Sequence, residues 1–160
     1  MKRGQFQISF GVIFSIIIVI FTLAIAFYVI SYFLNTQKCT NLGLFYKDIE
    51  ERVDKAWYSP ATSESFKGSV PSSVDFVCFG NLSQSYNPAY KTQYEELKKY
   101  RNYPVNVFTY PIEAGCGSVP GFYNLKHARM NEFFCAPAKS GKISVNIKKD
   151  VSDALVLVSP

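Results

Sequence analysis

One stretch near the amino terminus, Ile8 to Leu34, limits what this chain can fold into. Its only polar side chains are the hydroxyls of Ser, Thr and Tyr residues, and it carries no charge. As a helix, these residues would extend roughly 40 Å, which exceeds the ~30 Å hydrocarbon core of a bilayer. We therefore expect residues 8–34 to form a transmembrane helix, with the additional length taken up by tilt or protrusion.

The flanks of this stretch predict its orientation. Residues 1–7 form a short basic leader that contains Lys2 and Arg3 and no acidic residue. Because basic flanks stay on the cytoplasmic side, we expect a cytoplasmic amino terminus and an extracellular carboxy-terminal domain. The predicted location is the cell membrane, crossed once.

The leader does not fit an ordinary secretory signal, whose apolar core of ~7–15 residues ends at a small-residue cleavage site. Here a basic pair is followed by Gly4 and Gln5, and the apolar run continues unbroken to Leu34. These first 34 residues resemble the class III signal peptides of archaeal type IV pilins and pilin-like proteins. The resemblance implies that a prepilin peptidase cuts at Gly4-Gln5 and that the apolar helix is retained. It also implies filament assembly through that helix, although the glutamate common there in the family is absent from this chain.

The helix is predicted to continue beyond the membrane, over residues 35–58. Apolar residues recur there at spacings of three and four, which indicates one buried stripe on a helix. Pro60 would end the helix. The stripe consists of Leu42, Phe45, Ile49, Val53 and Ala56, with Trp57 beside it.

Four cysteines lie in the predicted extracellular part, namely Cys39, Cys78, Cys116 and Cys135. An even number in an exported domain predicts two disulfides, and reduced, buried thiols are the alternative. The spacing is too wide for a zinc site. Three pairings are possible, and the sequence alone does not choose among them. Loop closure favours the sequential one, Cys39 with Cys78 and Cys116 with Cys135, because shorter loops cost less entropy to close.

Residues 59–160 are predicted to form one small β-rich ectodomain with one short helix. Ser59 onward reads as a loop, and the lysines at 148 and 149 suit an exposed sheet edge. The expected fold class is α+β, a long amino-terminal transmembrane helix continuing into a small extracellular antiparallel β-sheet head, disulfide-bonded, with about four or five strands. The expected strands are 73–79, 105–110, 133–135 and a terminal hairpin of 142–149 with 154–158, and the expected helix is 90–100.

The residues do not predict an enzyme. His127 lies in a polar run and is expected at the surface, while Glu95 and Glu96 would point about 100° apart on a helix. The Gly-rich run 114–121 lacks the Gly-Lys-Ser/Thr end of a phosphate-binding loop. We expect no cofactor and no metal. The net charge of +5 includes Lys2 and Arg3, and the diffuse remainder does not favour nucleic acid.

Two further features concern modification and partners. Asn81-Leu82-Ser83 is an acceptor sequon for N-glycosylation, although such a pattern also arises by chance. Tyrosines cluster between residues 86 and 110, and tyrosine is favoured on binding surfaces, although these rings would equally cover the margin of the core. The candidates for a partner contact are Tyr86, Tyr90, Tyr94, Tyr100 and Tyr103.

The function predicted from these features is that of a membrane-anchored, pilin-like cell-surface structural protein. It would be either a filament subunit or a single-pass anchor that displays its head. The alternative is a membrane-tethered binding module for another envelope protein or a ligand. The expected partners are membrane lipid, further copies of the chain through the amino-terminal helix, and other envelope proteins.

Overall fold

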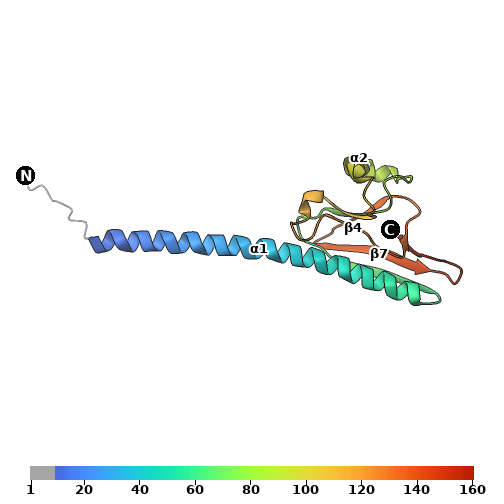
Figure 1. Cartoon of the computed structure of the whole chain (residues 1–160), viewed down its shortest axis with the longest axis horizontal. Helices are drawn as coiled ribbons and strands as arrows, with labels where there is room; N and C mark the ends of the chain where they lie inside the picture. Colours follow the sequence, from blue (N-terminus) through green and yellow to red (C-terminus); the bar gives the residue numbers. More distant parts are fainter. Residues whose placement is uncertain (1–9) are drawn as a thin grey trace, which may run out of the picture. The chain divides into compact units, whose positions relative to one another are not determined.

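The computed structural model describes residues 10–160 (Figure 1). The predicted leader, with Lys2, Arg3 and the Gly4-Gln5 processing site, lies outside the described residues. The chain divides into two compact units, residues 1–37 and residues 38–160. We describe residues 10–37 and the second unit, called the head below, separately.

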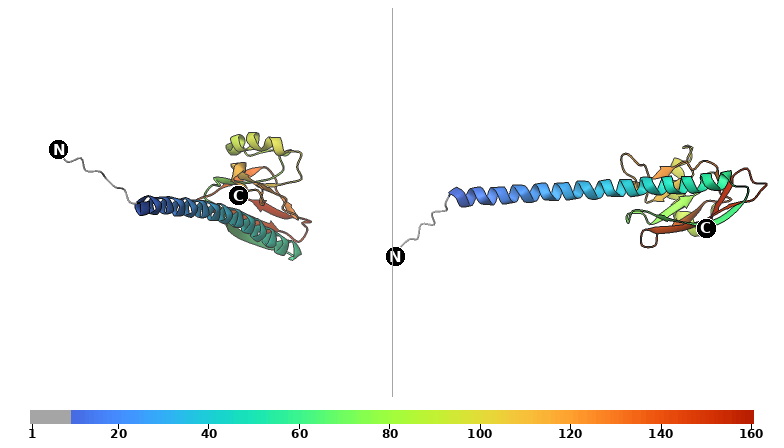
Figure 2. Two further views of the ribbon diagram at one scale, coloured as in Figure 1. Left: turned by 60° about the vertical axis from the view of Figure 1, so that its left-hand side comes forward. Right: turned by 90° about the horizontal axis from the view of Figure 1, so that it is seen from below.

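The longest element is the helix α1, Phe10–Tyr58, of 49 residues. Both views of Figure 2 draw it as one helix without a break. In its first part, residues 10–37, every residue is exposed. Its last part belongs to the head, where the predicted stripe is buried together with Tyr46. The predicted continuation of the helix and its end before Pro60 are thus confirmed.

The head contains two four-stranded sheets rather than the four or five strands predicted. The first sheet has the order β1-β7-β8-β5 and the second β4-β3-β2-β6. All strand pairs are antiparallel except β5 with β8. The strands are β1 (Thr62–Ser69), β2 (Phe76–Phe79), β3 (Val107–Tyr110), β4 (Phe122–Tyr123), β5 (Ala128–Arg129), β6 (Phe134–Pro137), β7 (Lys142–Lys149) and β8 (Val156–Ser159).

One core joins the helix to both sheets. The buried stripe of α1 packs with the inward-facing residues of β7, Ile143, Val145 and Ile147, and with apolar residues of β2, β3 and β6. Strict alternation of apolar and polar residues in β7 predicts this strand, and its hairpin with β8 is confirmed.

The predicted edge position of Lys148 and Lys149 is wrong, because β7 lies between β1 and β8. Lys148 forms an ion pair with Asp150 at 3.2 Å. The Lys149 ammonium donates to the carbonyl oxygens of Trp57 and Ser59 at 2.8 and 2.9 Å. It thus binds carbonyl groups at the carboxy end of α1, where a helix attracts positive charge.

Strand β1 corrects the prediction of a loop after Ser59. It pairs with β7 over all eight of its residues. Its inward side carries Phe66 and Gly68, and a β-carbon at Gly68 would approach the Phe45 ring to 2.7 Å. The segment contains a single large apolar residue, so its own sequence does not indicate a strand. It forms a strand by pairing with β7.

A second, smaller core lies on the other side of the β2–β3–β6 sheet. Here the short helix α2, Lys91–Leu97, contributes Tyr94 and Leu97 to a cluster with residues of these strands (Figure 1). The helix predicted over 90–100 is shorter than expected, because the 3-10 turns η1 (Pro88–Tyr90) and η2 (Lys98–Tyr100) flank it. A third 3-10 turn, η3 (Ile112–Ala114), follows β3.

The four cysteines form two disulfides, which confirms that part of the prediction. The sequential pairing is wrong: Cys39 bonds Cys116, and Cys78 bonds Cys135. Closing the longer loops costs only about 1.6 kcal/mol more over both bonds. That cost is small beside the strand register, which places Cys78 directly opposite Cys135 in β2 and β6.

Candidate functional site

The most extensive candidate surface is the apolar part of α1, residues 10–37. Its large side chains are exposed to between 45% and 83%. Three hydroxyls within it donate to carbonyls of the helix itself: Ser15 to Gly11 at 2.8 Å, Thr22 to Val19 at 2.9 Å and Thr36 to Tyr32 at 3.0 Å. Such bonds satisfy polar groups without water. By length and composition, this is the one helix within residues 10–160 that is able to cross a membrane.

The phenylalanines of this part include Phe10, Phe14, Phe21, Phe27 and Phe33, all of them more than half exposed. Since buried apolar surface stabilises by ~25 cal/mol per Å², this surface favours contact with lipid or with another apolar helix over water. Apolar surface of this extent marks a contact with a membrane or with another protein.

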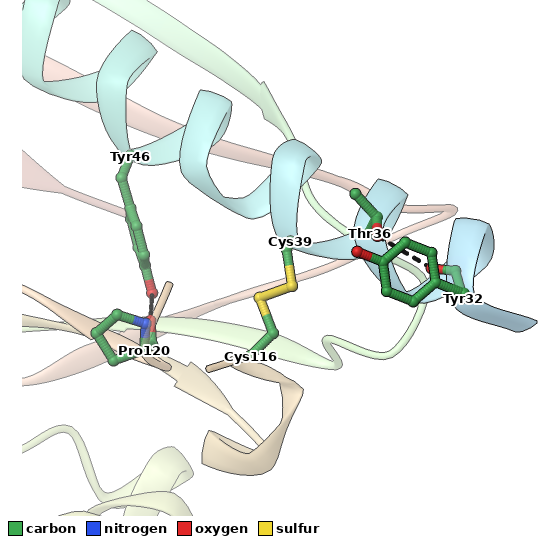
Figure 3. Close-up of a disulfide and its surroundings, with 6 residues drawn as sticks. All are labelled: Tyr32, Thr36, Cys39, Tyr46, Cys116 and Pro120. Carbon is green, nitrogen blue, oxygen red and sulfur yellow. Dashed lines mark hydrogen bonds between the residues drawn. A yellow bond between two sulfur atoms is a disulfide. The ribbon is translucent and has the colours of Figure 1, made fainter. Parts of the chain in front are cut away.

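A disulfide and a hydrogen bond fasten the head part of α1 to the segment between η3 and β4 (Figure 3). Cys39 bonds Cys116, and two helical turns further on the Tyr46 hydroxyl donates to the Pro120 carbonyl at 3.2 Å. Burial raises the pKa of Tyr46, so this hydroxyl keeps its proton. The helix is therefore held by a covalent bond as well as by its buried stripe.

Tyr123 continues this attachment along the helix. Its ring stacks on Tyr46 with the ring centres 4.8 Å apart, and its hydroxyl donates to the Glu50 carboxylate at 2.5 Å. Burial and the bond to Glu50 raise the pKa of Tyr123 to about 12. Both effects favour the protonated phenol, which is the form able to donate.

His127 completes the attachment. It was expected as a surface residue and is 33% exposed, but its ring also stacks on Trp57 at 3.9 Å and its Nδ1 lies 2.9 Å from an Asp54 oxygen. The residue has a φ of 59°, a backbone conformation that side chains other than glycine rarely adopt. The imidazole therefore positions the segment before β5 against α1.

Within residues 10–160, the side chains that could bind a metal or take part in catalysis have the following surroundings. No group of three or more His, Cys, Asp or Glu residues there is placed to hold a metal ion. All four cysteine sulfurs are bonded in disulfides, so none is available as a nucleophile. Glu95 pairs with Lys98 at 3.5 Å, whereas Glu96 lies beside Tyr110 and raises its pKa through a hydrogen bond.

The predicted contact tyrosines lie in two places. Tyr94 is buried and donates to the Leu82 carbonyl at 2.8 Å, Tyr86 stacks on it at 4.3 Å, and Tyr90 packs on Phe76. Tyr100 and Tyr103 instead form a separate group with Phe122, in which Tyr103 is 54% exposed. Tyr86, Tyr90, Tyr94 and Tyr100 therefore all contribute to the smaller core, and Tyr103 is the one of the five that is more than half exposed.

The sequon asparagine lies in a tight turn after β2. Asn81 is exposed, and its side-chain oxygen accepts from the Ser83 backbone N–H at 2.8 Å. Between them, Leu82 is buried and fixes the turn to the smaller core. Glycosylation at Asn81 stays a prediction.

Sequence reasoning missed two features of the head. The first is the exposure of three large apolar side chains, Tyr58 at the end of α1 and Val151 and Leu155 between β7 and β8. The second, the helix–edge groove, is a hollow of about 520 Å³ between α1 and the edge strand β1, next to Leu44 and Lys67. Single exposed apolar residues give no periodic signal in the sequence, and the groove exists only in the folded head.

No protein-family model matches this sequence, and no curated protein or solved structure matches it. A proposal for its function therefore rests on the chain itself. The two features with the clearest physical consequence are the exposed apolar part of α1 and the fastening of the same helix into a disulfide-bonded head.

Proposed function

We infer that this chain is a pilin-like cell-surface structural protein, anchored in the membrane by the apolar part of α1 and able to assemble through it. In this proposal the amino terminus is cytoplasmic and the head extracellular. The peptidase that processes such leaders would cut at Gly4-Gln5. The supporting observation is that one continuous helix, Phe10–Tyr58, is apolar and exposed in one part and a buried element of the head in the other.

Removing the apolar part of α1 from water is energetically favourable. Fully burying one large apolar side chain is worth ~1.5–3 kcal/mol, and residues 10–34 expose nineteen of them. The total is tens of kcal/mol, more than the ~5–15 kcal/mol that stabilises a typical domain. Lipid and neighbouring copies of the same helix are the two covers that fit the proposal.

The head suits an oxidising compartment outside the cell. Its disulfides join α1 to the segment after η3 and β2 to β6. Such bonds form and persist in extracellular proteins and are rare in the cytosol. The Cys39–Cys116 bond also keeps α1 attached to the rest of the head when its apolar part is embedded in a membrane or packed against other helices.

The proposal is tested by replacing residues 8–34 with a polyleucine span of equal length. Polyleucine preserves anchoring but removes the side-chain pattern through which copies would recognise each other. We expect the variant to reach the cell surface as a monomer, whereas the natural chain forms oligomers or filaments visible by negative-stain microscopy of sheared cell surfaces. Equal assembly of both chains, or no assembly of either, would contradict the structural role.

Anchoring and orientation need a separate measurement. Protease added to intact cells should remove the head, and it should leave the head intact if the orientation is reversed. As a test of anchoring, Ile17→Lys, Ile20→Lys and Leu23→Lys together place three charges near the middle of the apolar part, at ~2.5–3.5 kcal/mol each or about 7.5–10.5 kcal/mol in total. Surface display that is insensitive to these three charges would argue against a transmembrane segment.

A binding module is the second candidate, and one observation favours it. Tyr103, which is 54% exposed, contacts the partly buried rings of Tyr100 and Phe122. Lys99 and Arg101 lie next to Tyr100 in sequence, and no ion pair is found for either within residues 10–160. Tyrosine and arginine are enriched where proteins bind other proteins. Two results together would favour this role. The natural chain would be monomeric, and it would capture an envelope protein in a way that Tyr103→Ala abolishes.

A further inference from the structure

The two disulfides of the head differ in their exposure. Cys78 and Cys135 are 0% and 1% exposed and pack in the smaller core, to which α2 contributes. Cys39 and Cys116 are each partly exposed. A disulfide is reduced by attack of a thiolate on one of its sulfur atoms, so exposed bonds are the labile or regulatory ones and buried bonds resist reduction. In the folded head, the Cys39–Cys116 bond is therefore the one open to this reaction.

A tight turn presents Cys116 at the surface of the head. The backbone N–H of Cys116 donates to the Val119 carbonyl at 2.7 Å, and the N–H of Val119 donates to the Cys116 carbonyl at 2.9 Å. Between them, Gly117 and Ser118 are exposed. A β-carbon at Gly117 would meet no atom within 4 Å, so there is open space beside this end of the turn. A protein that carries the attacking thiol has room to approach from this side.

Further contacts hold the 116–119 turn against α1 independently of the disulfide. The Tyr46 hydroxyl donates to the Pro120 carbonyl at 3.2 Å (Figure 3). Val119 lies 3.5 Å from the position of a β-carbon at Gly43, which is ordinary contact distance. The turn therefore stays beside α1 when the bond is open, and the two sulfur atoms remain close enough to pair again.

We propose that Cys39–Cys116 is a reversible redox site that a dithiol protein of the Cys-x-x-Cys class opens and closes, while Cys78–Cys135 stays closed. A paired dithiol fits this site because its first thiol forms the mixed disulfide and its second thiol resolves it. The open space beside Gly117 accommodates the protein surface that surrounds such a pair.

The exchange balances in two steps. A thiolate of the partner attacks Sγ of Cys116 and forms a mixed disulfide, while the Cys39 sulfur leaves with the electron pair of the broken bond and takes up a proton. The second thiol of the partner loses its proton and attacks the partner's sulfur in the mixed disulfide, which releases Cys116 as a thiolate that is then protonated. The partner's dithiol is thereby oxidised to a disulfide, and Cys39 and Cys116 are reduced to thiols. The reverse sequence closes the bond.

Opening the bond changes how much of α1 is fixed to the head. Cys39 precedes Leu42, the first buried residue of the stripe, by about one helical turn. The stripe packs in the core of the head without help from the sulfur atoms. The oxidised state thus fixes one more turn of α1 than the reduced state does. All of these residues belong to the head, so the inference does not rest on the proposed assembly.

The test follows the reduction of each bond in the full-length protein in detergent micelles. The protein is incubated with reduced thioredoxin or with dithiothreitol at equal dithiol concentrations, thiols are alkylated at intervals, and mass spectrometry of the peptides reports each cysteine. We expect Cys39 and Cys116 to be alkylated about tenfold sooner than Cys78 and Cys135, and thioredoxin to act about tenfold faster than dithiothreitol. Equal rates for the two bonds, or no advantage of thioredoxin over dithiothreitol, would overturn the proposal.

Two further measurements separate exchange from unfolding. The fluorescence of Trp57, the chain's one tryptophan, should be unchanged when only the first bond is open, because its ring stacks on His127 at the carboxy end of α1. Removal of the reductant and addition of oxidised glutathione should restore the Cys39–Cys116 bond. A change in fluorescence that accompanies the opening, or cysteines that fail to pair again, would refute a reversible site.

Gly117 provides a matched pair of variants. Gly117→Phe adds a large side chain at the open end of the turn, whereas Gly117→Ala adds one methyl group. We expect Gly117→Phe to slow reduction by thioredoxin about tenfold and to leave the rate with dithiothreitol unchanged, because bulk at this position excludes a protein more than a small molecule. Gly117→Ala should react like the natural chain with both reagents, and the fluorescence of Trp57 checks that each variant is folded. A folded Gly117→Phe chain that thioredoxin reduces at the natural rate would contradict approach through the turn.

Discussion

Removing the Cys39–Cys116 disulfide measures how much of the head's stability depends on fastening α1. The two residues are 77 apart in sequence, and the loop-closure model gives about 4.5 kcal/mol for such a bond. The second bond, Cys78–Cys135, spans 57 residues and gives about 4.2 kcal/mol by the same model. Loop entropy alone therefore ranks the first bond slightly higher.

Packing reverses that order. Cys78 and Cys135 are 0% and 1% exposed, whereas Cys39 and Cys116 are half-buried. Replacing each fully buried cysteine by alanine removes one buried atom, worth ~0.8 kcal/mol if counted as a methylene, or about 1.6 kcal/mol for the pair. We expect a loss of about 4.5 kcal/mol for C39A/C116A and about 5.8 kcal/mol for C78A/C135A.

The assay is urea unfolding of the full-length protein in detergent micelles, followed by the fluorescence of Trp57, the chain's one tryptophan. Wild-type protein with and without reductant provides the reference. A loss below about 1 kcal/mol for C39A/C116A would show that the buried stripe holds the helix without the bond. A larger loss for C39A/C116A than for C78A/C135A would refute the packing argument.

Three other predictions address the helix stripe, the Tyr123 contact and the sequon. Ile49 is fully buried, so Ile49→Ala should lower the free energy of unfolding by about 2–5 kcal/mol in urea, while Leu44→Ala on the exposed side changes it by less than about 0.5. Because folding raises the pKa of Tyr123 from 10.0 to about 12, its contribution to stability is complete below pH 10 and lost as pH rises to about 12. Unfolding at alkaline pH should accordingly be less pH-dependent in Tyr123→Phe. If Asn81 carries a glycan, intact mass spectrometry of protein from its native membrane should show added mass that Asn81→Gln removes; Asn87→Gln, in a similar turn without a sequon, should retain it.

The sequence predicted the elements whose pattern is local. The spacing of Leu42, Phe45, Ile49 and Val53 is sufficient to show a helix with one buried side, and the alternation in Lys142–Lys149 is sufficient to show a strand. Both patterns follow directly from the repeat of the backbone, so no distant residue is needed to recognise them.

The sequence did not predict elements that depend on a distant partner. Strand β1 has one large apolar residue, Phe66, and exists because β7 offers eight residues to pair with. The disulfide pairing follows from the register of β2 with β6, which loop lengths do not determine. His127 was expected at the surface because its neighbours are polar, yet Trp57 and Asp54, about seventy residues earlier, determine its position.

The Cys39–Cys116 bond also determines how the protein would bear a mechanical load. A pulling force on the amino-terminal part of α1 reaches the head at Cys39. From Cys39 it is transmitted through the disulfide to Cys116. The segment between them, which holds the buried stripe, β1, β2, α2 and β3, lies inside the closed loop and does not carry the force. A force on the helix would therefore extend the segment after Cys116 before it could separate the buried stripe of α1 from the core.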